Sequence, residues 1–427
     1  MNTNLPEYIK KVALPLGSVT DGEDFSDLEP LKEILKNVRI VGLGESTHGT
    51  REFFQLKHRV TRFLVEQMGY MAFTIEAGVL PCMNIDEYAF MGKGDRAKAL
   101  ASQGYWTWDT EEVTDLIEWM RQHNLNCRRG EECRFIGYDI KPIPEACAAI
   151  RRIVKKALPE GYEKADGVLK SIEELPFPNT SDEPRTCDDI MWLWGWLAAQ
   201  EMTICSAAGQ PAFDLAMTSC RMVYQYMYGM VVNSGGLDGR DKGMAENIFH
   251  IMESLPDDAK IVVWAHNAHI AADDSWKSMG KRLKERYGDQ YFPFALTFTR
   301  GTFQSRLIPQ DDDGHKPFGD LQEFDAGEPR EGFWEKDFMQ VREGDWYIGL
   351  REARRLDEEA LRWCSRRRQV FGAGGGYAPI SENAAQDERL FQEYNLSTHF
   401  DGVFHIEKTT RARPTPTGMR KAGQASK

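Results

Sequence analysis

Three apolar segments of the chain are each followed by side chains that can move protons. The segments and the residues after them are Val38–Leu43 with Glu45 and His48, Met71–Ile75 with Glu76, and Ile261–Trp264 with His266 and His269. Carboxylates and imidazoles are the usual groups of general acid–base catalysis. We expect the segments to be strands, and open α/β sheets bind ligands at the carboxyl ends of their strands. The sequence therefore predicts an acid–base site at one edge of a sheet.

His48 is the leading candidate for a general base that activates water. It lies in the run Gly44-Glu45-Ser46-Thr47-His48-Gly49, just ahead of a predicted helix over Glu52–Met68. This setting, a loop between a strand and a helix, favours a functional histidine over one that merely caps the loop. A carboxylate bonded to the ring would orient it.

Glu45 and Glu76 are the candidate carboxylates. A buried carboxylate needs a partner. We expect the histidines to be the partners, and Arg51 and Arg59 are close in sequence as alternatives. Each glutamate taken alone fits a structural ion pair equally well.

His266 and His269 are three residues apart and allow more than one chemistry. They could bind zinc with a carboxylate as third ligand. They could instead polarise a carbonyl group or protonate a leaving group. Since His266 is nearer the predicted strand end, it is the preferred catalytic residue.

Ser46 resembles the nucleophile of a G-x-S-x-G elbow, because it follows a strand and precedes a helix. The final glycine of that motif is missing, since His48 stands in its place, and no Asp then His order downstream fits a triad. Ser46 is therefore not predicted to be the nucleophile.

Strand-like and helix-like patterns alternate along most of the chain, which predicts an α/β fold with a mostly parallel sheet flanked by helices. From 144 to 231 only helical patterns are found, so we expect an inserted all-helical subdomain there, acting as a lid on a catalytic core of 1–143 and 232–407. Residues 308–380 read as irregular. The tail, 408–427, has six basic and no acidic residues and is expected to be disordered.

The bulk composition excludes some functions. A net charge of −13 over 427 residues disfavours binding to nucleic acid or anionic lipid. Eight cysteines without a C-x-x-C spacing are typical of free thiols in a reducing compartment. The polar start of the chain does not read as a signal peptide, and no apolar run approaches the ~18 residues of a membrane span. We expect a cytoplasmic protein with a small-molecule substrate; its oligomeric state is not predicted.

Several motifs together resemble the erythromycin esterase family over about Val38 to Glu407. They are Gly44-Glu45-Ser46-Thr47-His48-Gly49, Glu52-Phe53 with Lys57 and Arg59, Thr74-Ile75-Glu76-Ala77-Gly78, Tyr105-Trp106-Thr107-Trp108, Trp119-Met120-Arg121, Gly137-Tyr138-Asp139, Arg240-Asp241-Lys242, Ala265-His266-Asn267-Ala268-His269 and Phe400-Asp401-Gly402-Val403. The resemblance implies hydrolysis of a macrolactone ester without metal or another cofactor. The Tyr105 motif is shared with the broad family, including members associated with succinoglycan synthesis.

By this resemblance the catalytic histidine is His48, the two glutamates are Glu45 and Glu76, and the second histidine motif is His266 and His269. The residues expected to bind substrate or support the site are His269, Arg51, Arg59, Tyr105, Trp106 and Asp139. In this mechanism His48 takes a proton from water, the glutamates orient the histidines, and His266 stabilises the oxyanion or protonates the departing alkoxide.

Two alternatives remain open at this point. A metallohydrolase would use His48, Glu76 and His266 as ligands. A binding protein would sequester a hydrophobic ligand in the same cleft without changing it.

Overall fold

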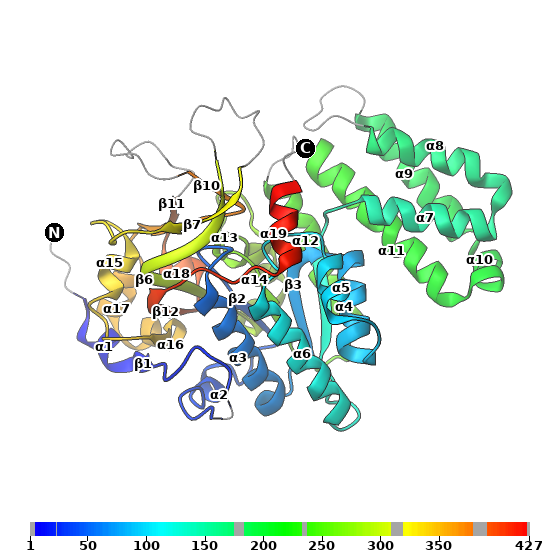
Figure 1. Cartoon of the computed structure of the whole chain (residues 1–427). Helices are drawn as coiled ribbons and strands as arrows, with labels where there is room; N and C mark the ends of the chain where they lie inside the picture. Colours follow the sequence, from blue (N-terminus) through cyan, green and yellow to red (C-terminus); the bar gives the residue numbers. More distant parts are fainter. Residues whose placement is uncertain are drawn as a thin grey trace. The chain divides into compact units, whose positions relative to one another are not determined.

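The computed structural model describes residues 5–22, 24–174, 183–232, 237–308, 319–378 and 391–424. They form two compact units; Figure 1 shows the ribbon coloured along the sequence. Unit 1 comprises 1–74, 85–135 and 256–427, and unit 2 comprises 75–84 and 136–255. Each unit is described by itself below.

A mixed, mostly parallel sheet forms the centre of unit 1. Strand β2 (Ile40–Leu43) pairs in parallel with β5 (Ile261–Trp264) and with β6 (Tyr291–Leu307), and β6 pairs in parallel with β12 (Gly402–Thr409). All residues of β2 and β5 are buried, as expected for parallel strands covered on both faces. The predicted fold class, a mostly parallel sheet with flanking helices, is confirmed.

The remaining strands extend this sheet or lie beside it. The sheet order is β1-β8-β12-β6-β2-β5-β3-β4, with β7 and β10 also paired to β6 and a separate pair of β9 with β11. Their bounds are β1 Leu14–Pro15, β3 Ala72–Gly78, β4 Arg134–Asp139, β7 Leu321–Asp325, β8 Trp346–Gly349, β9 Arg368–Phe371, β10 Gly376–Tyr377 and β11 Phe391–Tyr394. Strands β3 and β4 begin in unit 1 and end in unit 2.

Helix α3 (Arg51–Met68) shows why the sequence folds as it does in unit 1. Its apolar residues recur every three or four positions, and that face is buried. The helix ends at Gly69, whose φ of 72° is left-handed and favours glycine. The other helices of unit 1 are α1 Glu7–Val12, α2 Leu31–Ile34, α5 Arg96–Ser102, α6 Glu111–Asn126, α13 Asn267–Ile270, α14 Met279–Tyr287, η3 Gly288–Gln290, α15 Trp334–Phe338, α16 Leu350–Leu356, α17 Glu358–Cys364, α18 Leu396–His399 and α19 Pro416–Gln424.

Unit 2 is largely helical (green in Figure 1). Its helices are α7 Pro144–Ala157, η1 Pro159–Gly161, α8 Tyr162–Glu173, α9 Glu183–Ala198, α10 Glu201–Ala208, α11 Gln210–Tyr226, the π-helix η2 Met227–Val232 and α12 Leu237–Ser254; α4 (Val79–Met91) runs from unit 2 into unit 1. Apolar side chains of α7, α8, α9 and α11 form one buried cluster. Unit 2 is longer than the predicted insertion of 144–231, because it also takes in 75–84, 136–143 and 232–255. That these helices act as a lid stays a prediction.

Two expectations about the second half of the chain are wrong. Residues 319–378, which read as irregular, contain β7, β8, β9, β10 and three helices. These elements are short, so they show little periodicity. The tail is not disordered up to Gln424, because β12 continues to Thr409 and α19 follows. The run Asn233-Ser234-Gly235-Gly236, whose composition predicts a turn, lies outside the described residues.

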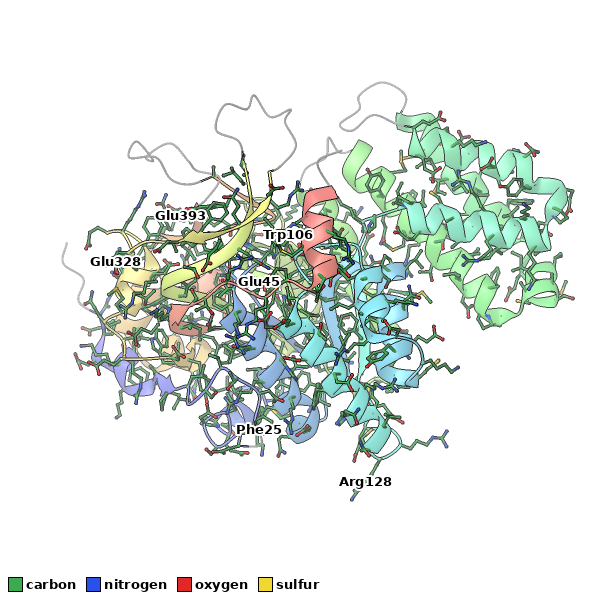
Figure 2. All side chains as sticks on the ribbon, viewed as in Figure 1. Phe25, Glu45, Trp106, Arg128, Glu328 and Glu393 are labelled. Carbon is green, nitrogen blue, oxygen red and sulfur yellow. The ribbon has the colours of Figure 1, made fainter. Side chains whose placement is uncertain are left out.

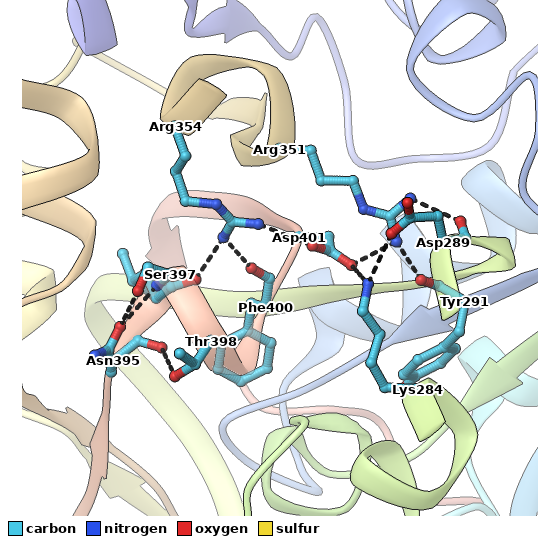
Figure 3. A network of polar contacts seen from close by, with 11 residues as sticks. Lys284, Asp289, Tyr291, Arg351, Arg354, Asn395, Ser397, Thr398, Phe400 and Asp401 are labelled. Atoms are coloured by element: carbon cyan, nitrogen blue, oxygen red, sulfur yellow. Dashed lines mark hydrogen bonds and ion pairs between the residues drawn. The ribbon is translucent and has the colours of Figure 1, made fainter. Parts of the chain in front are cut away.

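One buried carboxylate anchors the start of β12 (Figure 3). Asp401 accepts hydrogen bonds from Arg351 at 2.6 Å, Arg354 at 2.9 Å and Lys284 at 3.1 Å. Burial alone would raise the pKa of Asp401, but the hydrogen bond and charge of Arg351, with the charges of Lys284 and Arg354, lower it. This network ties α14 and α16 to the sheet.

No helix in the described part of the chain is long and apolar enough to cross a membrane.

Candidate active site

The loop after β2 makes contacts that only glycine permits at two positions. A Cβ atom on Gly44 would lie 2.0 Å from Oδ1 of Asn267, and one on Gly49 would lie 1.9 Å from the carbonyl oxygen of Gln304. Both distances are far below van der Waals contact, so the two glycines let the loop fit tightly against its neighbours. Glu45 and His48 lie between them, on this closely held segment.

Glu45 is the centre of the polar contacts in this loop (labelled in Figure 2). Its Oε1 is 2.6 Å from Nδ1 of His48. Its Oε2 accepts from Nζ of Lys57 at 2.6 Å and from Nε1 of Trp264 at 2.8 Å. Glu45 and Lys57 are both completely buried. The two carboxylate oxygens therefore have different partners, because Oε1 faces His48 and Oε2 faces the ammonium group of Lys57.

The ring of His48 is oriented for use as a base. Because a buried carboxylate flanks Nδ1, that nitrogen is the donor and Nε2 is the basic nitrogen. No residue in the described part of the chain forms a hydrogen bond with Nε2. The ring contacts Trp108 edge to face, with 5.3 Å between centroids, and its side chain is 12% exposed. The basic nitrogen can therefore receive a proton.

His266 lies next to His48, with ring centroids 5.1 Å apart. Its Nδ1 accepts from the backbone N–H of Ala268 at 3.2 Å, and its Nε2 is 3.2 Å from the carbonyl oxygen of Ser46. An N–H can only donate, so the neutral ring carries its proton on Nε2. His269 lies further along, buried against Trp276 at 5.8 Å. Of the two histidines, His266 is the one that contacts the ring of His48.

A second polar cluster is found within unit 2. Arg240 donates to Glu76 at 2.8 Å and to both oxygens of Asp139, at 3.1 and 2.7 Å. Both carboxylates are buried. Lys141 is close by, and burial, together with the charge of Arg240, lowers the pKa of its ammonium group. Glu76 lies inside β3, which runs to Gly78, rather than after the strand end as predicted.

Arg51 and Arg59, the alternative partners predicted for the glutamates, are engaged elsewhere in unit 1. Arg59 forms an ion pair with Asp27 at 2.6 Å, and Arg51 lies 3.5 Å from Glu112. The pairing of Glu45 with His48 agrees with the prediction, but the cations on Glu45 and Glu76 are Lys57 and Arg240. Among the described residues, neither Arg51 nor Arg59, the alternatives to the histidines, pairs with Glu45 or Glu76.

The aromatic motif Tyr105-Trp106-Thr107-Trp108 follows α5, and one of its rings contacts His48. Trp106 is buried with Leu321 and Ala422, and Tyr105 exchanges hydrogen bonds with Gln103. Trp108, from the same motif, is the residue that contacts His48. A direct contact of Tyr105 or Trp106 with substrate stays a prediction.

Ser46 does not have the geometry of a nucleophile. Its Oγ is buried, and no hydrogen-bond partner for it is found in the described part of the chain. A serine nucleophile needs an adjacent base and access to the substrate. The structure therefore agrees with the prediction that Ser46 is not the nucleophile.

Lys57, Trp264 and Arg240 were assigned no role from the sequence. For Lys57 a signal was present, since it lies among the apolar residues of the buried face of α3. A cation on such a face needs a buried partner. Arg240 belongs to a recognisable motif, but its partners, Glu76 and Asp139, lie far away in sequence.

No group of three or more His, Cys, Asp or Glu side chains in the described ranges is arranged to hold a metal ion.

Known proteins resemble this chain in sequence or in fold. Erythromycin esterase type II of Escherichia coli is 23% identical over 438 residues, which cover 95% of this chain and 97% of that protein. A crystal structure described as a succinoglycan biosynthesis protein has a TM-score of 0.76 at 22% identity, covering 96% of this chain and 97% of that one. The erythromycin esterase EreC, as a variant in its open conformation, has a TM-score of 0.65 at 19% identity, covering 92% and 96%.

The model of the erythromycin esterase family matches residues 65–409, which include Glu76, Arg240 and His266 and begin after Glu45, His48 and Lys57. The match covers well over half of the chain. The chain therefore belongs to the erythromycin esterase family and is a hydrolase of that family.

Proposed function

We propose that the chain hydrolyses a carboxylic ester with a water molecule activated by His48, and that its substrate is the lactone of a macrolide antibiotic. The observation that carries the proposal is the 2.6 Å contact between Glu45 and Nδ1 of His48, which makes Nε2 the basic nitrogen. A base positioned in this way typically accelerates a reaction by ~10²–10⁴-fold.

The reaction proceeds through a tetrahedral intermediate. Nε2 of His48 takes a proton from water as the water oxygen attacks the ester carbonyl, and Glu45 stabilises the imidazolium. Collapse of the intermediate breaks the bond between the carbonyl carbon and the ring oxygen, and the departing alkoxide takes up the proton that His48 removed from water. The carboxylic acid formed at the same time releases its own proton to solvent. The products are a carboxylate and an alcohol in one opened chain.

His266 is proposed to assist this step. Its Nε2–H donates to the carbonyl oxygen of Ser46 at 3.2 Å, at the long end for a hydrogen bond. To stabilise an oxyanion or protonate the alkoxide, the same N–H has to leave Ser46. His266 therefore changes its partner during the reaction in this proposal.

The proposal also includes the predicted role of Glu76, which is to orient the histidines. Arg240 holds one of its oxygens at 2.8 Å, so the carboxylate is fixed in direction. Replacing Glu76 with Gln keeps the shape and removes the charge. If Glu76 supports catalysis, the E76Q variant should lose most of its kcat while its melting temperature falls only slightly.

The macrolide and the absence of a metal requirement belong to the proposal. The names of Erythromycin esterase type II and EreC support a macrolide, at 23% and 19% identity. EDTA should leave activity unchanged. Loss of activity in EDTA that added zinc restores would instead support a metallohydrolase.

The test is a mass-resolved assay of the wild-type protein with macrolides of different ring size. Hydrolysis adds the mass of one water to the substrate, whereas sequestration changes no mass. The matched control is H48N, which should fold normally, bind the macrolide and lose at least ~10³-fold in kcat. An H48N variant that keeps more than about a tenth of wild-type kcat contradicts the assignment of His48.

A further inference from the structure

Lys57 occupies a position where an apolar residue would ordinarily be found. It lies on the buried face of α3, and none of its side chain is exposed. Its Nζ is 2.6 Å from Oε2 of Glu45 and 4.3 Å from the centre of the Trp264 ring. Burying an ammonium group carries a large desolvation penalty, which a partner of opposite charge offsets only when the geometry is good. A lysine at this place therefore calls for an explanation beyond packing.

We infer that Lys57 is a positioning residue that balances the charge of Glu45, so that this carboxylate orients His48 without holding a proton on it. The inference rests on the proposed role of His48 as the base. Lys57 acts through Glu45, since Oε2 faces Nζ while Oε1 faces the imidazole.

The physical reason is the charge balance inside the protein. A buried carboxylate needs a positive charge near it. Without Lys57, protonation of His48 would supply that charge, because Nδ1 is only 2.6 Å from Oε1. A histidine that is already protonated cannot take a proton from water. With Lys57 in place, His48 can stay neutral, donate from Nδ1 and keep Nε2 basic.

Among the described residues of unit 1, the rings that face His48 belong to Trp108 and His266, and of these two the imidazole of His266 can itself carry a charge. Trp264 also donates to Oε2 of Glu45, at 2.8 Å, but carries no charge. Lys57 and Trp264 thus share one oxygen and differ in charge, which makes them a matched pair for an experiment.

The experiment compares the pH profiles of kcat/KM for wild type, K57M and W264F, with a macrolide lactone as substrate. In K57M the acidic limb should move by about one pH unit or more toward higher pH, a tenfold or larger loss on that limb that recovers at higher pH. K57R, which restores the charge, should move the limb back. W264F should lower kcat/KM at every pH, but its acidic limb should stay at the same pH as that of wild type. A K57M limb that does not move, or a W264F limb that moves equally, overturns the inference.

A second measurement needs no substrate, so it separates this inference from the proposed function. Histidine labelled with ¹⁵N reports the charge and tautomer of each ring by NMR, and H48N identifies the signal of His48 among the nine histidines. At neutral pH the wild-type ring should be neutral with its proton on Nδ1, and the K57Q ring should be an imidazolium. If the two rings have the same charge, Lys57 has no such role. If they differ but no ester is cleaved, only the proposed function fails.

Discussion

The backbone N–H of Ala373 donates to the carbonyl oxygen of Ser46 at 2.7 Å. The same oxygen accepts a second hydrogen bond, from Nε2–H of His266 at 3.2 Å. The carbonyl oxygen of Ala373 in turn accepts a hydrogen bond from the backbone N–H of His48. The loop after β2 is therefore held on one side by His266 and on the other by the segment after β9. That segment was expected to be irregular, yet it fixes the backbone of the proposed base.

The first prediction concerns Ser46 itself. Oγ of Ser46 is buried and has no hydrogen bond in the described part of the chain. S46A therefore removes a hydroxyl group without breaking a hydrogen bond. We expect kcat within about twofold of wild type and the same or slightly higher stability, by up to ~1 kcal/mol. Urea denaturation and initial rates measure both quantities.

Its control is T47V. The hydroxyl of Thr47 is hydrogen-bonded to that of Thr50, so this variant should lose stability where S46A does not. An S46A protein that is inactive but melts like wild type would restore Ser46 as the nucleophile.

Long apolar periodicities made much of the fold predictable. Strand β5 has the predicted bounds, and α3 begins one residue before the predicted start. The end of β3 was harder, because α4 starts at Val79 directly after the strand, with no turn residue to mark the boundary. For this reason Glu76 was placed after the strand rather than inside it.

Side-chain partners were predictable only where they are close in sequence. His48 is three residues from Glu45, so their contact follows from one tight loop. The partner of Glu76 is Arg240, and their contact depends on how unit 2 folds as a whole. The elements between β6 and β12 also escaped prediction, because strands of two to five residues are too short to show alternation.

The second prediction concerns the C-terminal helix α19. Lys421 forms an ion pair with buried Asp109 at 2.9 Å and donates to the carbonyl oxygen of Ala101. Asp109 directly follows Trp108, the residue in contact with the ring of His48. K421M leaves Asp109 buried without this cation, so we expect a loss of ~3–5 kcal/mol in the free energy of unfolding and a lower kcat.

The matched control is R420M. Arg420 is exposed and one residue away, and its hydrogen bond to Thr417 is on the surface. This variant should differ from wild type by no more than about 0.5 kcal/mol. Equal stability of K421M and R420M in urea denaturation would show that α19 does not brace the segment around Trp108.

The third prediction is a pH dependence of stability that comes from Glu335. This carboxyl is 2% exposed, accepts the N–H of Phe371 at 3.0 Å through Oε1, and has no hydrogen bond at Oε2 in the described residues. Burial raises its pKa to about 8, against the smaller opposing effect of backbone hydrogen bonds. The folded state therefore disfavours ionisation. Stability is highest below the unfolded-state pKa and falls as pH rises from there to about 8.

E335Q removes this titration and keeps an oxygen for Phe371. As the pH rises from about 5 to about 8, the melting temperature of wild type should fall relative to that of E335Q. The difference should be equivalent to about a few kcal/mol in the free energy of unfolding. E359Q, at an exposed glutamate on α17, should show no such trend. If the melting temperatures of E335Q and wild type change equally with pH over this range, Glu335 is not a buried neutral carboxyl.

The last prediction separates binding from packing among the aromatic residues of unit 2. Tyr228 is 36% exposed, stacks on Tyr224 at 5.9 Å and has Nζ of Lys242 at 4.7 Å over its ring. The backbones of Gly229 and Gly239 touch, since a Cβ on Gly239 would lie 1.9 Å from the oxygen of Gly229. This contact brings Tyr228 beside the segment of Arg240, which holds Glu76.

Trp196 provides the contrast. It stacks on Trp192 at 5.8 Å, and a Cβ on Gly161 would lie 2.4 Å from its ring, so it is fitted into the helical packing. Y228A should raise KM for the macrolide severalfold with little change in kcat or melting temperature, because it removes binding common to the ground and transition states. W196A should instead cost ~2 kcal/mol of stability, less than the ~3–5 kcal/mol of a fully buried ring, with KM unchanged. Steady-state kinetics and melting curves of both variants decide the matter. If KM responds to W196A rather than Y228A, the stacked tryptophans bind the substrate and the Tyr224–Tyr228 pair is the packing element.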